Sequence, residues 1–338
     1  MTIGAGLTWE REGRDWPHRD ASRFVAAGGL RWHVQRMGPR AAQPLAHQAT
    51  LTTKPAAART SEPDAAPQAM RPPVALLIHG TGASTHSWRG LMPLLARHFD
   101  VVAMDLPGHA FTGTPAPACL ALPGMAAMVG ALVEVLGLDV GLVVGHSAGA
   151  AIGARLVLDG VLAPQALVSI NGAFLPLAGL PGLLFPPVAR LMAATPLAPQ
   201  LFARRQWDEP AVEKLIKGTG STLDPAGLAL YATLLRDARH AAGALGMMAR
   251  WDLRPLAHDL TRWRTPLTLI VGANDRAVPP ADALRVRAML PPGGVCSIET
   301  VPGAGHLVHE ERPDEVAGRV LAAATKAIDA SVKAAFTG

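Results

Sequence analysis

The sequence is poor in cysteine and in aromatic side chains. Among its 338 residues, Cys119 and Cys296 are the only cysteines, and they stand far apart without a C-x-x-C pattern. This excludes a disulfide framework and a cysteine-ligated zinc site, and it predicts two buried, reduced thiols. Aromatic residues make up only 4% of the chain, and Tyr231 is its single tyrosine. A mechanism that requires a pair of tyrosines is therefore excluded.

Long apolar runs, basic runs and metal-binding patterns are also missing. No apolar stretch reaches the ~18–20 residues that a membrane-spanning helix needs, and residues 1–20 lack the apolar centre of a signal peptide. We therefore expect a cytoplasmic protein. The net charge of +5 is scattered along the chain, which argues against a nucleic-acid partner. Without an H-x-x-x-H or H-E-x-x-H pair, we expect no metal and no cofactor. With 49% hydrophobic residues, the chain can bury a large core.

From residue 74 onward, short apolar runs alternate with segments of helical periodicity. Such runs are typical of strands buried on both faces of a parallel sheet, and the alternation predicts helices on both faces of that sheet. A hairpin of two strands, 22–28 and 30–37, precedes them. The later strands are predicted at 74–80, 100–108, 141–147, 164–172, 265–275 and 295–306. Helices are predicted at 88–99, 122–137, 148–160 and 280–290, and from about 312 onward.

Two stretches interrupt this alternation and define the expected domain organisation. Residues 39–73 are rich in Ala, Pro, Thr and Gln without periodicity, which predicts a flexible surface insertion. Residues 173–250 begin apolar and proline-rich and continue with helical segments, which predicts a helical cap inserted into the α/β core. The core is then expected at 22–172 and 251–338, after an N-terminal arm of residues 1–21.

Ser147 stands in the sequence G-H-S-A-G, where an apolar strand ends and a helix of small residues begins. A G-x-S-x-G motif in that context predicts a sharp turn that strains the serine and projects its hydroxyl from the edge of the sheet. Gly145 and Gly149 fit this turn because side chains at their positions would collide. A helix N-terminus also favours developing negative charge. Ser147 is therefore the predicted nucleophile.

A serine needs a base and an orienting acid to become a nucleophile. His306 follows the last predicted strand in a glycine-rich loop and is the expected base. His309 is the alternative base, and it is otherwise expected at the surface or near the cap. Asp275 ends a predicted strand, and groups at such strand ends collect at one edge of an α/β sheet. The other strand end suited to an acid holds Asn171, which carries no charge, so Asp275 is the expected acid.

The oxyanion of a tetrahedral intermediate needs backbone N–H donors. One donor is expected from Ala148, directly after the serine. The second is expected from Thr81, in the loop after the strand at 74–80, or from Gly82 if that loop turns differently. The expected substrate contacts, which stand in or beside the same motifs, are Gly80, His146 and Trp88.

Taken in order, the motifs HG, D-x-P-G-H, G-H-S-A-G, G-x-x-D-x-x-V-P and G-x-G-H resemble the α/β-hydrolase superfamily over roughly residues 20–330. The resemblance implies an α/β-hydrolase fold, with a mostly parallel central sheet flanked by helices and an inserted helical cap. The chain order Ser147, Asp275, His306 agrees with it. Stretches such as DWPHRDASRFVAAGGLRWHVQRMG and VVGHSAGAAI look most like the BchO family. Members of that family are associated with bacteriochlorophyll biosynthesis and described as magnesium-chelatase accessory proteins.

Two functions are consistent with these residues. The first is a serine hydrolase of an ester, thioester or related acyl bond. The resemblance adds an apolar tetrapyrrole intermediate as a candidate substrate. The second is a non-catalytic protein that binds a tetrapyrrole or assists magnesium chelatase, its expected partner. Epoxide hydrolases and dehalogenases resembling this fold use an aspartate where this chain has Ser147, while haloperoxidase or C–C hydrolase chemistry stays open. Apolar residues of the predicted cap also suggest peripheral contact with a membrane.

Overall fold

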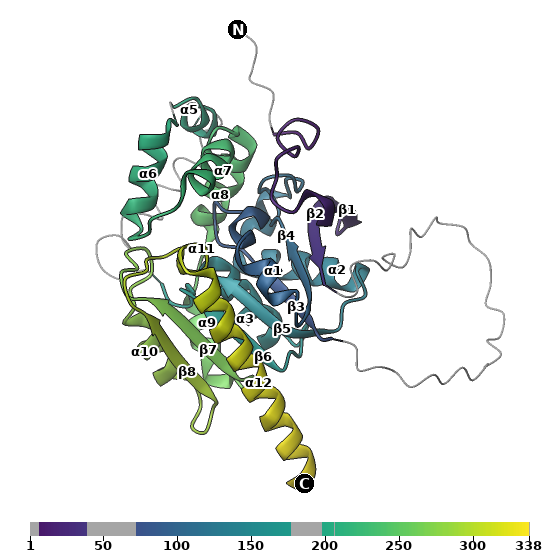
Figure 1. The fold of residues 1–338 in the computed structure, drawn as a ribbon. Helices are drawn as coiled ribbons and strands as arrows, with labels where there is room; N and C mark the ends of the chain where they lie inside the picture. Colours follow the sequence, from purple (N-terminus) through teal and green to yellow (C-terminus); the bar gives the residue numbers. More distant parts are fainter. Residues whose placement is uncertain (1–6, 39–71, 177–197, 206, 338) are drawn as a thin grey trace, which may run out of the picture.

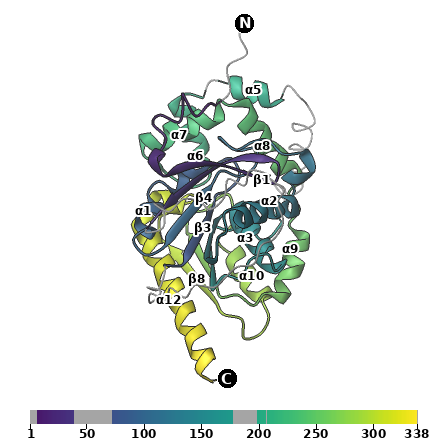
Figure 2. The same ribbon diagram turned by 90° about the vertical axis from the view of Figure 1, so that its right-hand side faces the viewer.

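The computed structural model of the protein describes residues 7–38, 72–176, 198–205 and 207–337 (Figures 1 and 2). Most of the predicted insertion 39–73 lies outside these residues, as do the start of the predicted arm and much of the apolar start of the predicted cap. The division of the chain at these places therefore stays a prediction.

One sheet organises the molecule, and its strands match the predicted apolar runs. They are β1 (Ser22–Ala27), β2 (Leu30–Met37), β3 (Val74–Ile78), β4 (Asp100–Met104), β5 (Val140–His146), β6 (Ala166–Ile170), β7 (Leu267–Gly272) and β8 (Cys296–Val301). Their order in the described sheet is β1-β2-β4-β3-β5-β6-β7-β8. β1 and β2 form the predicted antiparallel hairpin, β2 pairs antiparallel with β4, and the remaining pairs are parallel. The mostly parallel sheet confirms the predicted fold class.

Helices cover both faces of this sheet (Figure 2). On one face pack α2 (Leu122–Val135), α3 (Ala148–Leu158), α9 (Arg254–Asp259) and α10 (Asp282–Met289). On the other face pack α1 (Leu91–Leu95) and α12 (Pro313–Thr337). The shorter elements are η1 (Arg19–Ala21), η2 (Thr85–Trp88), η3 (Pro117–Leu120), η4 (Leu260–Arg262) and α11 (Val308–Glu311). Buried apolar side chains between sheet and helices make two cores, one on each face.

The helix predicted at 88–99 is much shorter in the structure. The chain forms the 3₁₀ helix η2 over Thr85–Trp88 and then α1 over Leu91–Leu95. Pro93 has no N–H to donate to the carbonyl of Arg89, so a continuous helix across this stretch would lose a hydrogen bond. The helix was predicted from the spacing of apolar residues, which does not take the effect of Pro93 into account.

Among the described residues that follow β6, four successive helices gather at one end of the molecule (Figure 1). They are α5 (Ala198–Arg204), α6 (Glu209–Gly218), α7 (Pro225–Leu235) and α8 (Ala238–Arg250), and we call them the cap helices. Three of them begin at an aspartate whose carboxylate accepts a backbone N–H of the first turn: Asp208, Asp224 and Asp237. Such N-caps fix where each helix starts.

Both cysteines are free and half-buried, so the expectation of two buried thiols was too strong. Cys119 lies in η3, and Cys296 opens β8, the edge strand of the sheet. An edge strand is covered less completely than the central strands, which leaves Cys296 partly accessible. No helix within the described residues is long and apolar enough to cross a lipid bilayer.

Candidate active site

Ser147 occupies a strained turn between β5 and α3. Its φ of 52° and ψ of −118° lie outside the regions that a residue with a side chain normally adopts. A Cβ added at Gly145 would lie 2.5 Å from the backbone nitrogen of Ala150, and one at Gly149 would lie 2.0 Å from the carbonyl oxygen of Ile78. The turn therefore requires glycine on both sides of the serine, as the motif predicts.

His306 and Asp275 lie in direct contact beside this turn. The Nδ1 of His306 is 2.8 Å from Oδ2 of Asp275, and the Asp275 side chain is fully buried. The second carboxylate oxygen accepts the N–H groups of Ala277 and Val278, at 2.8 and 2.9 Å. Because a carboxylate can only accept, His306 donates from Nδ1 and keeps Nε2 available as a base.

His146 joins the serine turn to the histidine loop. Its Nε2 lies 2.9 Å from the carbonyl oxygen of His306, so this nitrogen carries the proton and donates. The rings of His146 and His306 lie 4.7 Å apart between centroids. Burial, followed by the neighbouring imidazoles of His309 and His306, holds the pKa of His146 well below its usual value. The sequence suggested that His146 contacts substrate, whereas the structure gives its side chain a bracing contact inside the fold.

The loop at Gly80–Ala83 approaches the serine turn closely. A Cβ added at Gly80 would lie 3.0 Å from Cβ of Ser147, so only glycine permits this approach. Gly80 is buried, and the half-buried Thr81 and Gly82 follow it, with Gly82 at a φ of 76°. The N–H of Ala148 opens α3, where the first N–H groups have no partner within the helix. The proposed donors thus stand on elements that meet at Ser147.

Burial contradicts one predicted substrate contact and the surface position that was one of the two expected for His309. Trp88 is fully buried in the core against α1 and α12, so it offers no surface to a substrate. His309 is fully buried as well, rather than at the surface, with its ring 4.4 Å from His146 and 4.8 Å from Trp88. Burial lowers the pKa of His309 to about 3. The neutral imidazole of His309 packs against the rings of His146 and Trp88.

Two further polar residues near the site, Asn171 and His240, have roles that their sequence surroundings do not indicate. Asn171, at the end of β6, bonds through its side chain to the backbone of Gly272, Gly305 and His306. His240 of α8 accepts the N–H of Ala110 at Nδ1 and donates from Nε2 to the carbonyl of Gly82. The only signal for Asn171 was a polar residue at a strand end. His240 carries no motif that would mark it.

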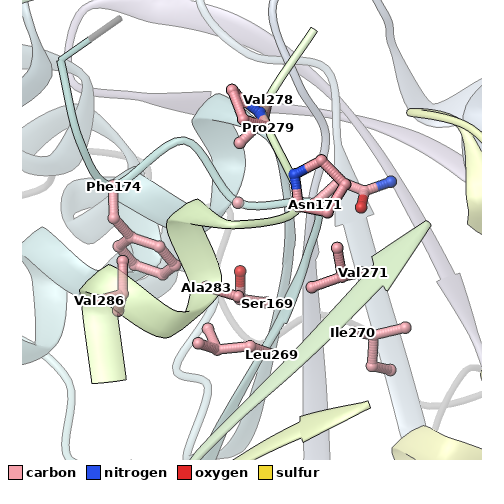
Figure 3. A pocket seen from close by; sticks show the side chains of 12 residues that line it. Ser169, Asn171, Phe174, Leu269, Ile270, Val271, Val278, Pro279, Ala283 and Val286 are labelled. Carbon is pink, nitrogen blue, oxygen red and sulfur yellow. The ribbon is translucent and has the colours of Figure 1, made fainter. Parts of the chain in front are cut away.

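A small cavity lies between the sheet and α10, with Asn171 among its lining residues (Figure 3). Its volume is about 20 Å³, room for a single water molecule. Ser169, Asn171, Val278 and Ala283 are among the residues that line it. This cavity is too small for an organic substrate.

The described residues contain no cluster of His, Cys, Asp and Glu side chains that could hold a metal ion. Two buried carboxylates of this region are bound to histidines instead. Asp275 binds His306, and Asp105 accepts from His33 Nδ1 at 2.8 Å and from the N–H of Thr85. The arrangement suits proton transfer and backbone stabilisation of an oxyanion.

A strained serine after a parallel strand, with a buried histidine–aspartate pair beside it, defines the α/β-hydrolase class of proteins. The sequence profile described as "Alpha/beta hydrolase family" matches residues 75–319, and the chain belongs to that family. The chain is 34% identical to the magnesium-chelatase 30 kDa subunit of Rhodobacter capsulatus, over 91% of this chain and 95% of that protein. This similarity agrees with the resemblance to the BchO family that the sequence motifs indicate.

Two further relatives widen the comparison. The pimeloyl-[acyl-carrier protein] methyl ester esterase of Methylococcus capsulatus is 29% identical, over 72% of this chain and 92% of that protein. The crystal structure of an alpha/beta hydrolase fold protein from Burkholderia ambifaria superposes with a TM-score of 0.66 at 22% identity, over 89% of this chain and 97% of that one. The structural likeness concerns the fold alone.

Proposed function

We propose that the protein is a serine hydrolase that cleaves an ester, thioester or related acyl bond. The observation that carries the proposal is the buried 2.8 Å contact between His306 Nδ1 and Asp275 Oδ2 beside the strained Ser147. This contact fixes the imidazole in the tautomer that a base needs. The esterase among the relatives supports the same reaction class.

In this mechanism Ser147 Oγ attacks the acyl carbon while His306 Nε2 takes its proton. The carbonyl π bond opens to an oxyanion, which then reforms the double bond and expels the leaving group. His306 returns the proton to the leaving oxygen or sulfur. Water repeats the sequence on the acyl-enzyme, again through His306, and frees Ser147. The Asp275 carboxylate stabilises the imidazolium that forms.

The oxyanion is held in this proposal by the N–H groups of Ala148 and Thr81. Ala148 stands at the start of α3, where the helix dipole also favours negative charge. Thr81 follows Gly80, whose close approach to Ser147 brings the loop within reach. The N–H of Gly82 is the alternative second donor. Each such donor contributes on the order of 3–4 kcal/mol to transition-state stabilisation in other enzymes.

The proposed substrate is an apolar small molecule, and the similarity to the magnesium-chelatase subunit points to a tetrapyrrole intermediate. Residues 173–250 are proposed to form the cap over it, with peripheral membrane contact through the apolar part of the cap.

The second candidate function is a non-catalytic tetrapyrrole-binding or magnesium-chelatase accessory protein. The observation that favours it is the 34% identity to a chelatase subunit over almost the whole of both chains. In this case the residues of the serine site would be a remnant of the fold. Chelatase would be its binding partner.

The test compares wild type with Ser147→Ala. We expect wild type to hydrolyse p-nitrophenyl esters and to react with a fluorophosphonate, and the variant to lose at least ~10³-fold in kcat and all labelling. His306→Ala and Asp275→Asn should also lose activity while remaining folded. Pigment production in a bacteriochlorophyll-forming host decides whether the reaction is the physiological role.

Two outcomes would reject the proposal. One is a folded wild type that neither labels nor turns over any ester of a series from acetyl to long-chain acyl groups. The other is a Ser147→Ala variant that turns over esters as fast as wild type. Normal pigment synthesis with a Ser147→Ala variant that lacks esterase activity would favour the accessory function as the physiological role.

A further inference from the structure

We propose that Asn171 is a positioning residue that fixes the nucleophile turn, the acid-bearing strand end and the histidine loop relative to one another. The inference rests on the proposed hydrolase function and extends it to a residue that no motif marks. Asn171 directly follows β6, is only 2% exposed and has a φ of 46°. A non-glycine residue in this left-handed conformation carries strain that its side-chain contacts must offset.

The side-chain amide of Asn171 links two strand ends. Its Nδ2 donates to the carbonyls of Gly305 and His306, at 2.9 and 2.8 Å, which uses both of its N–H groups. Its Oδ1 accepts the N–H of Gly272, the last residue of β7, at 2.8 Å. The carbonyl of Gly272 in turn accepts the N–H of Asp275 at 3.1 Å. One amide therefore ties the strand that leads to the acid to the loop that carries the base.

Backbone hydrogen bonds also connect the residues around Asn171 to Ser147. The carbonyl of Ile170 accepts the N–H of Ser147 at 3.0 Å, and the N–H of Ala173 donates to the carbonyl of Ser147 at 3.1 Å. The N–H of Asn171 itself donates to Ile270 in β7 at 2.8 Å. Residues 170–173 thus hold the serine from both sides, and all three proposed catalytic residues are connected through this segment.

Only an asparagine meets these contacts at this length. Aspartate has the same shape but no N–H, so it would present acceptors to two carbonyl oxygens and repel them. Alanine would leave two carbonyls and one N–H without this partner. The carbonyl of His306 also accepts from His146, and the N–H groups of Gly305 and Leu307 donate to Glu311 and Ser221. The loop keeps these bonds and is expected to shift rather than unfold. A shift of this kind affects the reaction more than the stability.

The experiment compares Asn171→Asp and Asn171→Ala with matched variants of Gln35. Gln35 is a fully buried amide on β2, away from the site, whose Nε2 donates to the carbonyl of Pro17 at 2.6 Å. The controls are Gln35→Glu and Gln35→Ala. For each protein we would measure kcat and KM with a p-nitrophenyl ester, the melting temperature, and the downfield proton resonance of the His306 Nδ1–H. Loss of that resonance in His306→Ala assigns it.

We expect both Asn171 variants to lose about 10- to 100-fold in kcat with KM little changed, because small displacements of reacting groups cost this much. Their His306 resonance should shift or disappear. The Gln35 variants should lower the melting temperature and leave kcat and the resonance as in wild type. Wild-type kcat together with an unchanged resonance in Asn171→Asp would overturn the inference.

The resonance also separates the two proposals. If wild type hydrolyses no ester, the proposed function fails. The resonance then still reports whether Asn171 positions His306. A resonance lost in the Asn171 variants and kept in the Gln35 variants supports the positioning role, and one kept in all of them rejects it.

Discussion

At the residue scale, Gly149 and Gly318 make a matched pair of helical glycines. A Cβ at Gly149 would lie 2.0 Å from the carbonyl oxygen of Ile78, whereas Gly318 in α12 has no atom within 4 Å of that position. Gly149→Ala is therefore expected to destabilise the protein by about 1–3 kcal/mol through overpacking, and to abolish activity by displacing Ser147. Gly318→Ala should stabilise it by about 0.5–1 kcal/mol.

Urea unfolding followed by circular dichroism would measure both changes. Gly318→Ala is the control for Gly149→Ala, because the substitution is the same and only the surroundings of the two glycines differ. A Gly149→Ala protein as stable and as active as wild type would contradict the close packing of α3 against β3.

Individual candidate residues could be predicted where a short stretch of sequence shows both the residue type and its position at the end of a strand. Ser147 and Asp275 each follow a buried apolar strand, and His306 follows the partly exposed edge strand β8. Parallel strand ends meet at one edge of a sheet. Asn171 was not predictable as a partner, because the residues it binds in the histidine loop stand 134 and 135 positions away. The burial of His309 likewise depends on Trp88, which only the folded chain brings against it.

At the element scale, the cap helix α8 is fastened to the loop that approaches Ser147. Gly243 of α8 lies so close to Gly108 that a Cβ there would be 2.1 Å from the Gly108 carbonyl oxygen. His240, one turn earlier, donates to the carbonyl of Gly82 at 3.1 Å and accepts from the N–H of Ala110 at 3.0 Å. Helix α8 is thus part of the site's framework.

His240→Ala is expected to lower kcat for ester hydrolysis about 10-fold while leaving KM unchanged, because the loop that supplies an oxyanion donor loses its anchor. His240→Gln retains an amide N–H that can reach Gly82 and should recover part of this loss. Steady-state kinetics, measured below the melting temperature of each variant, would show both the loss of kcat and its partial recovery. An exposed histidine, His258 of α9, supplies a control whose replacement should have no effect. Equal kcat in wild type and His240→Ala would refute this role.

Some strands could be predicted from the sequence, whereas the packing of the N-terminal residues could not. Strands such as β3 and β6 are continuous apolar runs, and their burial on both faces makes them recognisable. The described N-terminal residues were not recognisable as packing elements, although Leu7 and Trp16 are buried against Phe111 and Leu234. The backbone N–H of Leu7 donates to the carboxylate of Asp237, 230 positions away. No local pattern encodes a contact of that range.

At the scale of the whole molecule, buried ionisable groups give stability two opposing dependences on pH. Burial lowers the pKa of His79, His109 and His309 to about 3 and that of His240 to about 4. In the unfolded chain these imidazoles take up protons below about pH 6.5, and in the folded protein they do not. Stability is therefore expected to fall as the pH drops from about 6.5 toward 4.

The carboxyl of Glu310 gives stability the opposite dependence on pH. Its carboxyl accepts the hydroxyl of Tyr231 at Oε1, at 2.8 Å, and its Oε2 has no hydrogen-bond partner among the described residues. Burial raises the pKa of Glu310 to about 8, from a usual value of 4.5. The folded protein thus keeps a proton that the unfolded chain releases. The stabilisation is complete below about pH 4.5 and is lost as the pH rises toward 8.

Between pH 6.5 and 8 the unfolded histidines still release protons, so the contribution of Glu310 is measured as the difference between wild type and Glu310→Gln, which has the same histidines. A single proton changes stability by at most about 1.4 kcal/mol per pH unit, so wild type should lose up to about 2 kcal/mol relative to Glu310→Gln over this interval. The amide of Glu310→Gln does not ionise, so this variant should lack the part of the slope that comes from Glu310. Urea unfolding at both pH values measures the difference, and Glu134→Gln, at an exposed position on α2, should keep the wild-type slope. If Glu310→Gln retained that slope too, the cap helix α7 and the core helix α11 would not be joined through a protonated carboxyl.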